Sequence, residues 1–174
     1  MPLSERERRD WLRLARTENI GPVTFRNLIA RFGTASTALA EVPRMASCGG
    51  AKSFVLPDQS AIAQEIEALA KLGGRMIASC EPEYPRGLKA LEAPPPILSV
   101  LGHPHLLQKE MIAMVGARNA SALARKFADT LARDLGFAGI VVVSGLARGI
   151  DAAAHEAALA VGTVAVVAGG VDIV

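Results

Sequence analysis

The sequence predicts an α/β protein in which a small all-helical module precedes a parallel β-sheet. Two observations support this fold class. Apolar residues recur at helical spacing through the first ~70 residues, whereas short apolar runs alternate with helical segments after Gly74. The 174 residues are 51% hydrophobic and 21% charged, so the chain can bury a core and has room for one domain or two small ones.

Four helices are expected in the N-terminal module. They cover residues 6–16 and 22–32, a segment from Thr34 or Ser36 to about Ala40, and a segment from the capping cluster at 57–60 to the Gly73-Gly74 pair. The turn at 20–23 could be a helix–hairpin–helix element that holds a DNA backbone with its N–H groups. It has one glycine where that motif usually has two, so a packing role is the alternative interpretation.

Five strands follow the helical module. They are expected at residues 75–79, 97–101, 111–115, 140–143 and 163–168. The last three are continuous apolar runs, which is typical of strands covered by helices on both faces of a sheet. Helices at about 121–135 and 150–160 separate them. This order of strands and helices predicts right-handed βαβ units, and therefore a Rossmann-like α/β sheet.

The change in periodicity predicts two domains, a helical domain at 1–72 and a Rossmann-like domain at 73–174. The chain reaches Val174 directly after the third glycine-terminated strand, where a doubly wound fold normally continues with a helix and further strands. We therefore expect the Rossmann-like sheet to be incomplete at its C-terminal end, as in the N-terminal part of a longer protein.

Glycine-containing turns end three consecutive parallel strands and predict one binding rim. In such sheets the ligand site lies beyond the carboxyl ends of the strands. Glycine permits close backbone approach, a following helix offers unpaired N–H groups, and an arginine adds a charge-assisted contact. The rim is therefore expected to bind phosphate. Its candidate binding residues are Gly116, Ala117, Arg118, Asn119, Ser144, Gly145, Arg148, Gly149, Gly169 and Gly170.

No catalytic, metal or cofactor site is expected. The GxGxxG and GxxxxGK[ST] motifs are absent, Cys48 and Cys80 lack metal-ligand spacing, and no GxSxG motif surrounds Ser144. Asp151 and His155 are four residues apart on one expected helix, where an exposed ion pair is favoured over a general base or a metal pair. The sequence has no membrane-span-like apolar run and begins with a charged segment, so a soluble cytoplasmic protein without a membrane partner is expected.

Several motifs in a fixed order resemble the DNA-processing protein A (DprA/Smf) family. The resemblance is close over residues 75–174, and residues 1–70 resemble, less distinctively, that family's SAM-like or helix–hairpin–helix-like N-terminal domain. The motifs are Glu83-Tyr84-Pro85, Pro94-Pro95-Pro96-Ile97-Leu98, Val115-Gly116-Ala117-Arg118-Asn119-Ala120-Ser121, Val143-Ser144-Gly145-Leu146-Ala147-Arg148-Gly149-Ile150-Asp151, Ala154-His155 and Gly169-Gly170-Val171-Asp172.

This resemblance implies a non-enzymatic protein that binds single-stranded DNA and loads RecA onto it during natural transformation and recombination. It also implies a homodimer formed through the Rossmann-like domain and a pocket above the sheet that holds the DNA backbone. Ala117 replaces the serine that is usual in the family's Gly-Ser-Arg element, which removes a hydroxyl but leaves the backbone amides and Arg118.

The alternative function is that of a small-molecule protein on a related Rossmann fold, either a nucleotide-binding sensor or a phosphoribohydrolase-like enzyme. That enzyme class carries a PGGxGTxxE motif with the catalytic glutamate. In this chain Ala168 precedes Gly169-Gly170 and Val-Asp-Ile-Val follows, so the sequence disfavours the enzyme.

Overall fold

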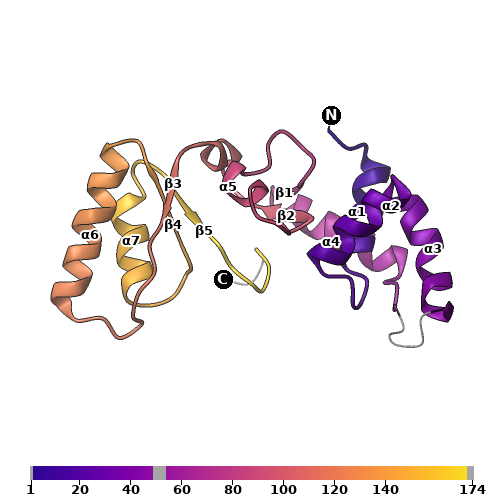
Figure 1. Ribbon diagram of the computed structural model, residues 1–174. Coiled ribbons are helices and arrows are strands. Elements are labelled where there is room, and N and C mark those ends of the chain that lie inside the picture. The colour runs from indigo at the N-terminus through magenta and orange to yellow at the C-terminus, as the bar shows by residue number, and fades with distance from the viewer. Residues whose placement is uncertain (1, 49–53, 172–174) are drawn as a thin grey trace. The chain divides into compact units, whose positions relative to one another are not determined.

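The computed structural model describes residues 2–48 and 54–171 (Figure 1). Contacts between residues group the chain into two compact units, residues 1–102 and 103–174. This grouping places the first two strands with the helices. The domain boundary at 72/73 that the sequence suggests stays a prediction, and each compact unit is described by itself below.

The first unit begins with four helices: α1 (Glu5–Ala15), α2 (Pro22–Phe32), α3 (Ala35–Cys48) and α4 (Gln59–Lys71). Ser4 and Glu7 form a capping box at the start of α1, and the Asp58 side chain accepts the Ser60 N–H at the start of α4. The expected end of the third helix near Ala40 is wrong, because α3 continues through Pro43. Val42 is fully buried in the helical core, so its packing stabilises the helix beyond the expected end.

The core of the helical part is formed by α1, α2 and α3. Trp11 and Phe25 meet edge to face, with ring centroids 5.0 Å apart. The buried members of this core share apolar side chains on the inner faces of the helices and the turn between α1 and α2; they are Leu14, Ile20, Phe25, Leu28, Ala35, Ala38, Leu39 and Val42. Burial of Ile20 shows that the turn at 20–23 contributes to this packing.

Two strands complete the first unit, β1 (Arg75–Ala78) and β2 (Ile97–Val100), with the short helix α5 (Arg86–Lys89) between them. They pair antiparallel with each other and form a separate two-stranded sheet. The sequence interpretation that assigned them to the Rossmann-like domain did not predict this pairing. Between the strands, the buried Tyr84 side chain donates a hydrogen bond to the Pro95 carbonyl at 2.8 Å.

A buried carboxylate ties β1 to the N-terminal helix. The Glu81 side chain accepts hydrogen bonds from the Arg8 guanidinium at 2.7 and 2.8 Å, and from the backbone N–H groups of Ala78 and Leu3. Arg8 also donates to the Met76 carbonyl at 2.7 Å. These bonds make residues 3–8 and 76–81 one connected network, although the two segments lie far apart in the sequence.

The second unit contains the parallel sheet. After the 3₁₀ helix η1 (Pro104–Gln108), its elements alternate as β3 (Met111–Ala113), α6 (Ala122–Phe137), β4 (Val141–Ser144), α7 (Ile150–Ala158) and β5 (Thr163–Ala165). The strands lie in the order β3-β4-β5, and both pairs are parallel. The predicted parallel βαβ arrangement is therefore confirmed, although β3 and β5 are shorter than expected.

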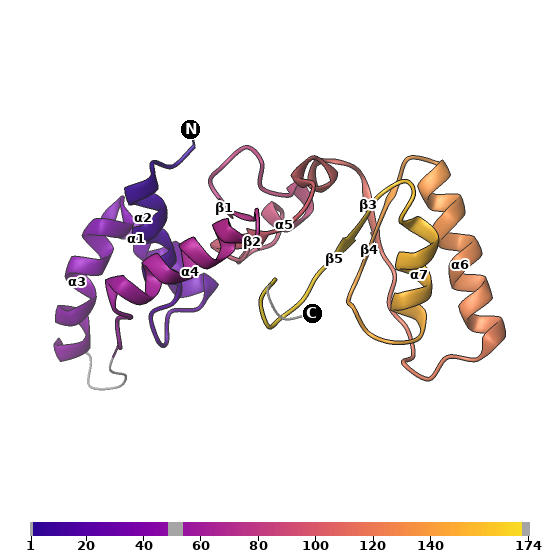
Figure 2. The same ribbon diagram turned by 180° about the vertical axis from the view of Figure 1, so that it is seen from behind.

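Both helices of the second unit lie on the same side of its sheet, as the two opposite views show (Figures 1 and 2). Two right-handed crossovers that proceed in the same direction across a sheet place their helices on one face. Continuous apolar strands had suggested helices on both faces, and within the described residues this expectation is not met. The buried core of this unit consists mainly of alanines, with one valine and one methionine: Met114, Ala128, Ala132, Val142, Ala154 and Ala158.

No helix within residues 2–48 and 54–171 combines the length and the apolar character that a membrane crossing requires.

Candidate nucleic-acid interface

The first two glycine turns of the rim are in direct backbone contact. Gly149 precedes α7 with φ 90° and ψ −120°, a conformation open to glycine and rare for other residues. A Cβ atom at Gly149 would overlap the carbonyl oxygen of Ala117 and lie 2.6 Å from that of Arg118. The Ile150 N–H also donates to the Ala117 carbonyl at 3.3 Å. The turn after β3 therefore rests on the start of α7.

Gly116 is needed for the same contact from the other side. A Cβ atom on Gly116 would lie 2.5 Å from Cγ1 of Ile150, the first residue of α7. Two glycines, one in each turn, thus allow the turns to approach each other. The sequence identified both as rim residues, but gave no signal that they pack against the opposite turn.

Arg118 and Arg148 project from these two adjoining turns. Both are exposed, and neither guanidinium has a hydrogen bond or an ion pair with any residue that the structure describes. Their backbones are close, because Gly149 follows Arg148 and contacts the Arg118 carbonyl. Two positively charged side chains without a counter-charge among the described residues therefore extend from neighbouring backbone segments, which suits contact with an external anion. Asn119, beside Arg118, is also exposed.

His155 holds the second turn in place. Its Nε2 lies 2.7 Å from the Gly145 carbonyl oxygen and must donate, because a carbonyl oxygen only accepts. Its Nδ1 lies 2.9 Å from the Thr163 hydroxyl, which donates to the Val142 carbonyl at 2.8 Å. His155 thereby connects the turn after β4 to the start of β5. No sequence motif indicated this role. It depends on the register of β4 against β5, which pairs Val142 with Thr163.

The expected exposed ion pair between Asp151 and His155 is wrong. Asp151 is buried in the first turn of α7, where a Cβ atom on Gly145 would lie 2.9 Å from its Oδ2 atom. His155 instead turns toward Gly145 and Thr163 and forms no ion pair with Asp151. The spacing of four residues puts both on one helical face, but that face packs against the sheet and the turn rather than facing solvent.

Ser144 lies at the end of β4 but its side chain is inside the unit. It is buried, and its hydroxyl donates to the Met114 carbonyl at 2.6 Å. This bond joins β4 to the segment that follows β3. The Ser144 hydroxyl therefore stabilises the sheet beneath the rim and does not face solvent.

The helix N-termini at the rim are partly used by the protein itself. At the start of α7, the N–H groups of Ile150 and Ala152 donate to the carbonyls of Ala117 and Ala147. The Ser121 side chain caps α6 by accepting the Ala124 N–H at 3.2 Å. The expectation that these helices offer free N–H groups is met only in part. The positive charge of the rim therefore comes mainly from Arg118 and Arg148.

The third turn lies farther along the chain. The Val166 N–H donates to the Ser144 carbonyl at 2.9 Å, which extends the β4–β5 ladder beyond Ala165. Gly169 and Gly170 follow this extension, Gly169 exposed and Gly170 with φ 122°. The close contacts described above join the first two turns. Asp172, which ends the last motif found in the sequence, lies outside the described residues.

Comparison with known protein families gives two matches that together follow most of the chain. The family described as DNA recombination-mediator protein A matches residues 75–174. A DprA-like N-terminal HHH domain matches residues 5–68.

Individual relatives agree with these matches. DNA processing protein DprA of Bacillus subtilis is 37% identical over 108 residues, which cover 60% of this chain and 36% of that protein. Protein Smf of Synechocystis is 26% identical over 187 residues, covering 99% of this chain and 46% of the relative. The chain therefore spans less than half the length of either relative.

A solved structure shares the fold over the whole chain. The X-ray structure of DNA processing protein A from Streptococcus pneumoniae matches 100% of this chain and 61% of that chain, with a TM-score of 0.71 and 24% sequence identity. The predicted fold class, a helical N-terminal part followed by a parallel α/β sheet, is thus confirmed.

Proposed function

This chain belongs to the DNA recombination-mediator protein A family, and on that premise we propose that it binds single-stranded DNA through the turns that hold Arg118 and Arg148. The site takes backbone phosphates, so binding has little sequence preference and a strong dependence on salt. We further propose that the whole protein, as a homodimer formed through its Rossmann-like domain, loads RecA onto the bound strand in recombination and natural transformation.

One observation carries the DNA-binding proposal. Arg118 and Arg148 are exposed, lack partners among the described residues, and extend from two turns that are locked together through Gly149. A guanidinium group binds phosphate oxygens in a bidentate manner, and a fixed backbone reduces the entropy that such binding costs. Ala117 contributes its backbone, since its carbonyl already accepts the Ile150 N–H and supports the turn.

Hydrogen bonds beneath the rim favour binding over catalysis. The Ser144 hydroxyl, the candidate nucleophile considered in the sequence, donates to the Met114 carbonyl. Both ring nitrogens of His155, a candidate base, are engaged with Gly145 and Thr163. A nucleophile and a base need each other within hydrogen-bond reach. These two side chains stabilise the fold instead, which supports a protein that binds DNA without catalysing a reaction on it.

The test replaces each arginine with alanine. Arg118→Ala and Arg148→Ala should each weaken binding of a labelled oligothymidylate by about 1.5–3 kcal/mol, the range for hydrogen bonds to charged groups. The double variant should lower the slope of log K against log salt by about 0.7 for each phosphate that the protein no longer neutralises. Arg125→Ala and Lys126→Ala, on the exposed surface of α6, are the controls and should change binding less.

Two outcomes would contradict this site. If Arg118→Ala and Arg148→Ala unfold the protein while the remaining folded fraction binds DNA normally, the arginines are structural. If AMP binds more tightly than the oligothymidylate and competes with it, the nucleotide-sensor alternative is correct. The RecA proposal is tested separately, by measuring whether the whole protein accelerates RecA filament formation on single-stranded DNA, and its failure would leave DNA binding intact.

A further inference from the structure

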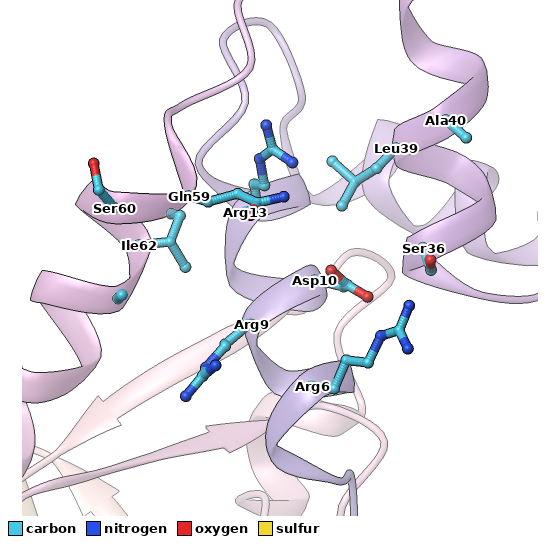
Figure 3. A pocket seen from close by; sticks show the side chains of 11 residues that line it. Arg6, Arg9, Asp10, Arg13, Ser36, Leu39, Ala40, Gln59, Ser60 and Ile62 are labelled. Carbon is cyan, nitrogen blue, oxygen red and sulfur yellow. The ribbon is translucent and has the colours of Figure 1, made fainter.

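A second basic site lies in the helical part of the chain, within the first unit. It is a pocket of about 730 Å³ between α1, α3 and α4. In Figure 3, Arg6, Arg9 and Arg13 rise from α1 in the middle, with α3 on one side and α4 on the other. The turn at 20–23, which the sequence suggested as a DNA-contacting element, is not part of its lining.

The charge of this pocket is positive. Three guanidinium groups line it against one carboxylate, that of Asp10. Arg13 donates to the Pro57 carbonyl at 2.9 Å, which anchors it in the pocket wall. Arg6 and Arg9 are exposed and have no hydrogen bond or ion pair within the described part of the chain. Two arginines are therefore free to bind an external anion.

The remaining lining suits a phosphodiester chain. Ser36, Gln59 and Ser60 add neutral hydrogen-bonding groups, and each stands in the first turn of α3 or α4. Helix starts carry partial positive charge, which adds to that of the arginines. The floor is apolar, since Leu39 and Ile62 are buried beneath the polar groups.

The arrangement of the arginines favours an extended ligand. Spacings of three and four residues put Arg6, Arg9 and Arg13 on one helical stripe, about 10 Å long at 1.5 Å per residue. In Figure 3 the Arg6 side chain extends toward the α3 side and Arg9 toward the α4 side. Their charges are thus spread along and across the pocket. A single small phosphate would be bound better by groups that converge on one point.

We propose that this pocket binds the backbone of single-stranded nucleic acid, as a contact separate from the Arg118–Arg148 rim. A strand bound in the pocket gains affinity through these added phosphate contacts. The site acts through charge, so it carries no base preference of its own. It does not require the rim to bind DNA, because its own residues all belong to the helical part.

The experiment measures oligothymidylate binding by the full chain at low salt. Arg6→Gln/Arg9→Gln should weaken binding of a long oligonucleotide about tenfold and lower the salt slope by about 0.7–1.4, corresponding to one or two phosphates. The matched control is Arg31→Gln/Arg44→Gln, which removes two charges from exposed positions of α2 and α3 outside the pocket. That control should change binding less than threefold. Arg6→Lys/Arg9→Lys should restore most of the slope, because it restores the charge.

Hydrogen exchange locates the contact independently of affinity. The oligonucleotide should protect backbone amides at the starts of α1 and α4, and should still do so in the Arg118→Ala/Arg148→Ala variant. The proposal is overturned if the Gln pair behaves like its control, or if this protection is absent. Protection that inorganic phosphate or AMP reproduces at equal concentration also overturns it, because the site would then take a small phosphate. If only the rim fails to bind DNA, the protection measured at the pocket still tests this proposal.

Discussion

Replacing Gly149 with alanine tests whether the two arginine-bearing turns must touch. Gly149 has φ 90° and ψ −120°, and an added Cβ would overlap the Ala117 carbonyl oxygen and lie 2.6 Å from the Arg118 carbonyl oxygen. These atoms belong to backbone, which cannot rotate aside as a flexible side chain can. The turn that carries Arg118 must therefore move away from α7.

The structure supplies a matched comparison for the magnitude. Gly139 also has a positive φ, 82°, but nothing lies within 4 Å of the Cβ that alanine would add. Gly139→Ala therefore costs only the conformational strain of a left-handed residue, about 1–2 kcal/mol. Gly149→Ala costs strain of about 1–3 kcal/mol in a glycine-only conformation, plus displacement of the neighbouring turn. We expect its total to reach at least about 4 kcal/mol, near the exceptional end for single substitutions.

Urea denaturation of the two variants measures this difference, and oligothymidylate binding of the folded protein measures its effect on the site. Gly149→Ala should weaken binding about as much as Arg118→Ala, because the Arg118 backbone moves with the turn. Gly139→Ala should bind like the unaltered protein. Equal loss of stability in both variants would refute the close contact. Normal DNA binding by a destabilised Gly149→Ala protein would show that the rim does not need the joined turns.

Two further predictions concern the first unit. Burial raises the pKa of Glu81, but hydrogen bonds from Arg8 and from backbone N–H groups outweigh it, so the pKa lies below its usual value of 4.5. The unfolded chain therefore takes up the proton first, and stability should fall as the pH drops below about 4.5. Glu81→Gln should lower the free energy of unfolding in urea at neutral pH by about 3 kcal/mol, because it leaves the Arg8 charge without its buried partner. The variant should also lose less stability than the unaltered protein as the pH falls below about 4.5. An unchanged loss of stability in acid would contradict this prediction. Burial also raises the pKa of Tyr84 to about 12. Because Tyr84 is the only tyrosine, phenolate absorbance should appear only as the protein unfolds in alkali. Ionisation of Tyr84 near pH 10 in the folded protein would contradict its burial. Tyr84→Phe should cost about 1–3 kcal/mol, the penalty of leaving the Pro95 carbonyl unpaired.

The parallel sheet and its arginine turns could be predicted from sequence because their signals are local. Continuous apolar runs indicate buried strands, and a glycine with an arginine directly after a strand indicates a rim. Arg118 and Arg148 are both exposed at such turns. The sequence does not indicate at which positions a side chain would clash, because that depends on how one turn packs against another. That information arises only when the chain folds.

Other features depend on partners distant in the sequence. His155 lies four residues from Asp151, which favoured an ion pair, but its partners Gly145 and Thr163 are set by the register of the strands. The antiparallel pairing of β1 with β2 likewise joins segments that are separated by a long connection, so local periodicity could not predict it. The basic pocket needs three helices to assemble, so a row of arginines on one helix was indistinguishable from a solvated face.

The bond between Arg8 and Glu81 determines where the chain can be divided for study. A fragment that begins near residue 73, at the change in sequence periodicity, would contain Glu81 but none of the N-terminal groups that bind it. In such a fragment the Glu81 carboxylate would lack its counter-charge beside β1. Low stability of the fragment would therefore reveal nothing about the parallel sheet. Fragments that begin near residue 103 keep every hydrogen bond of this network on the same side of the cut, so dissection of the proposed DNA-binding rim should start there.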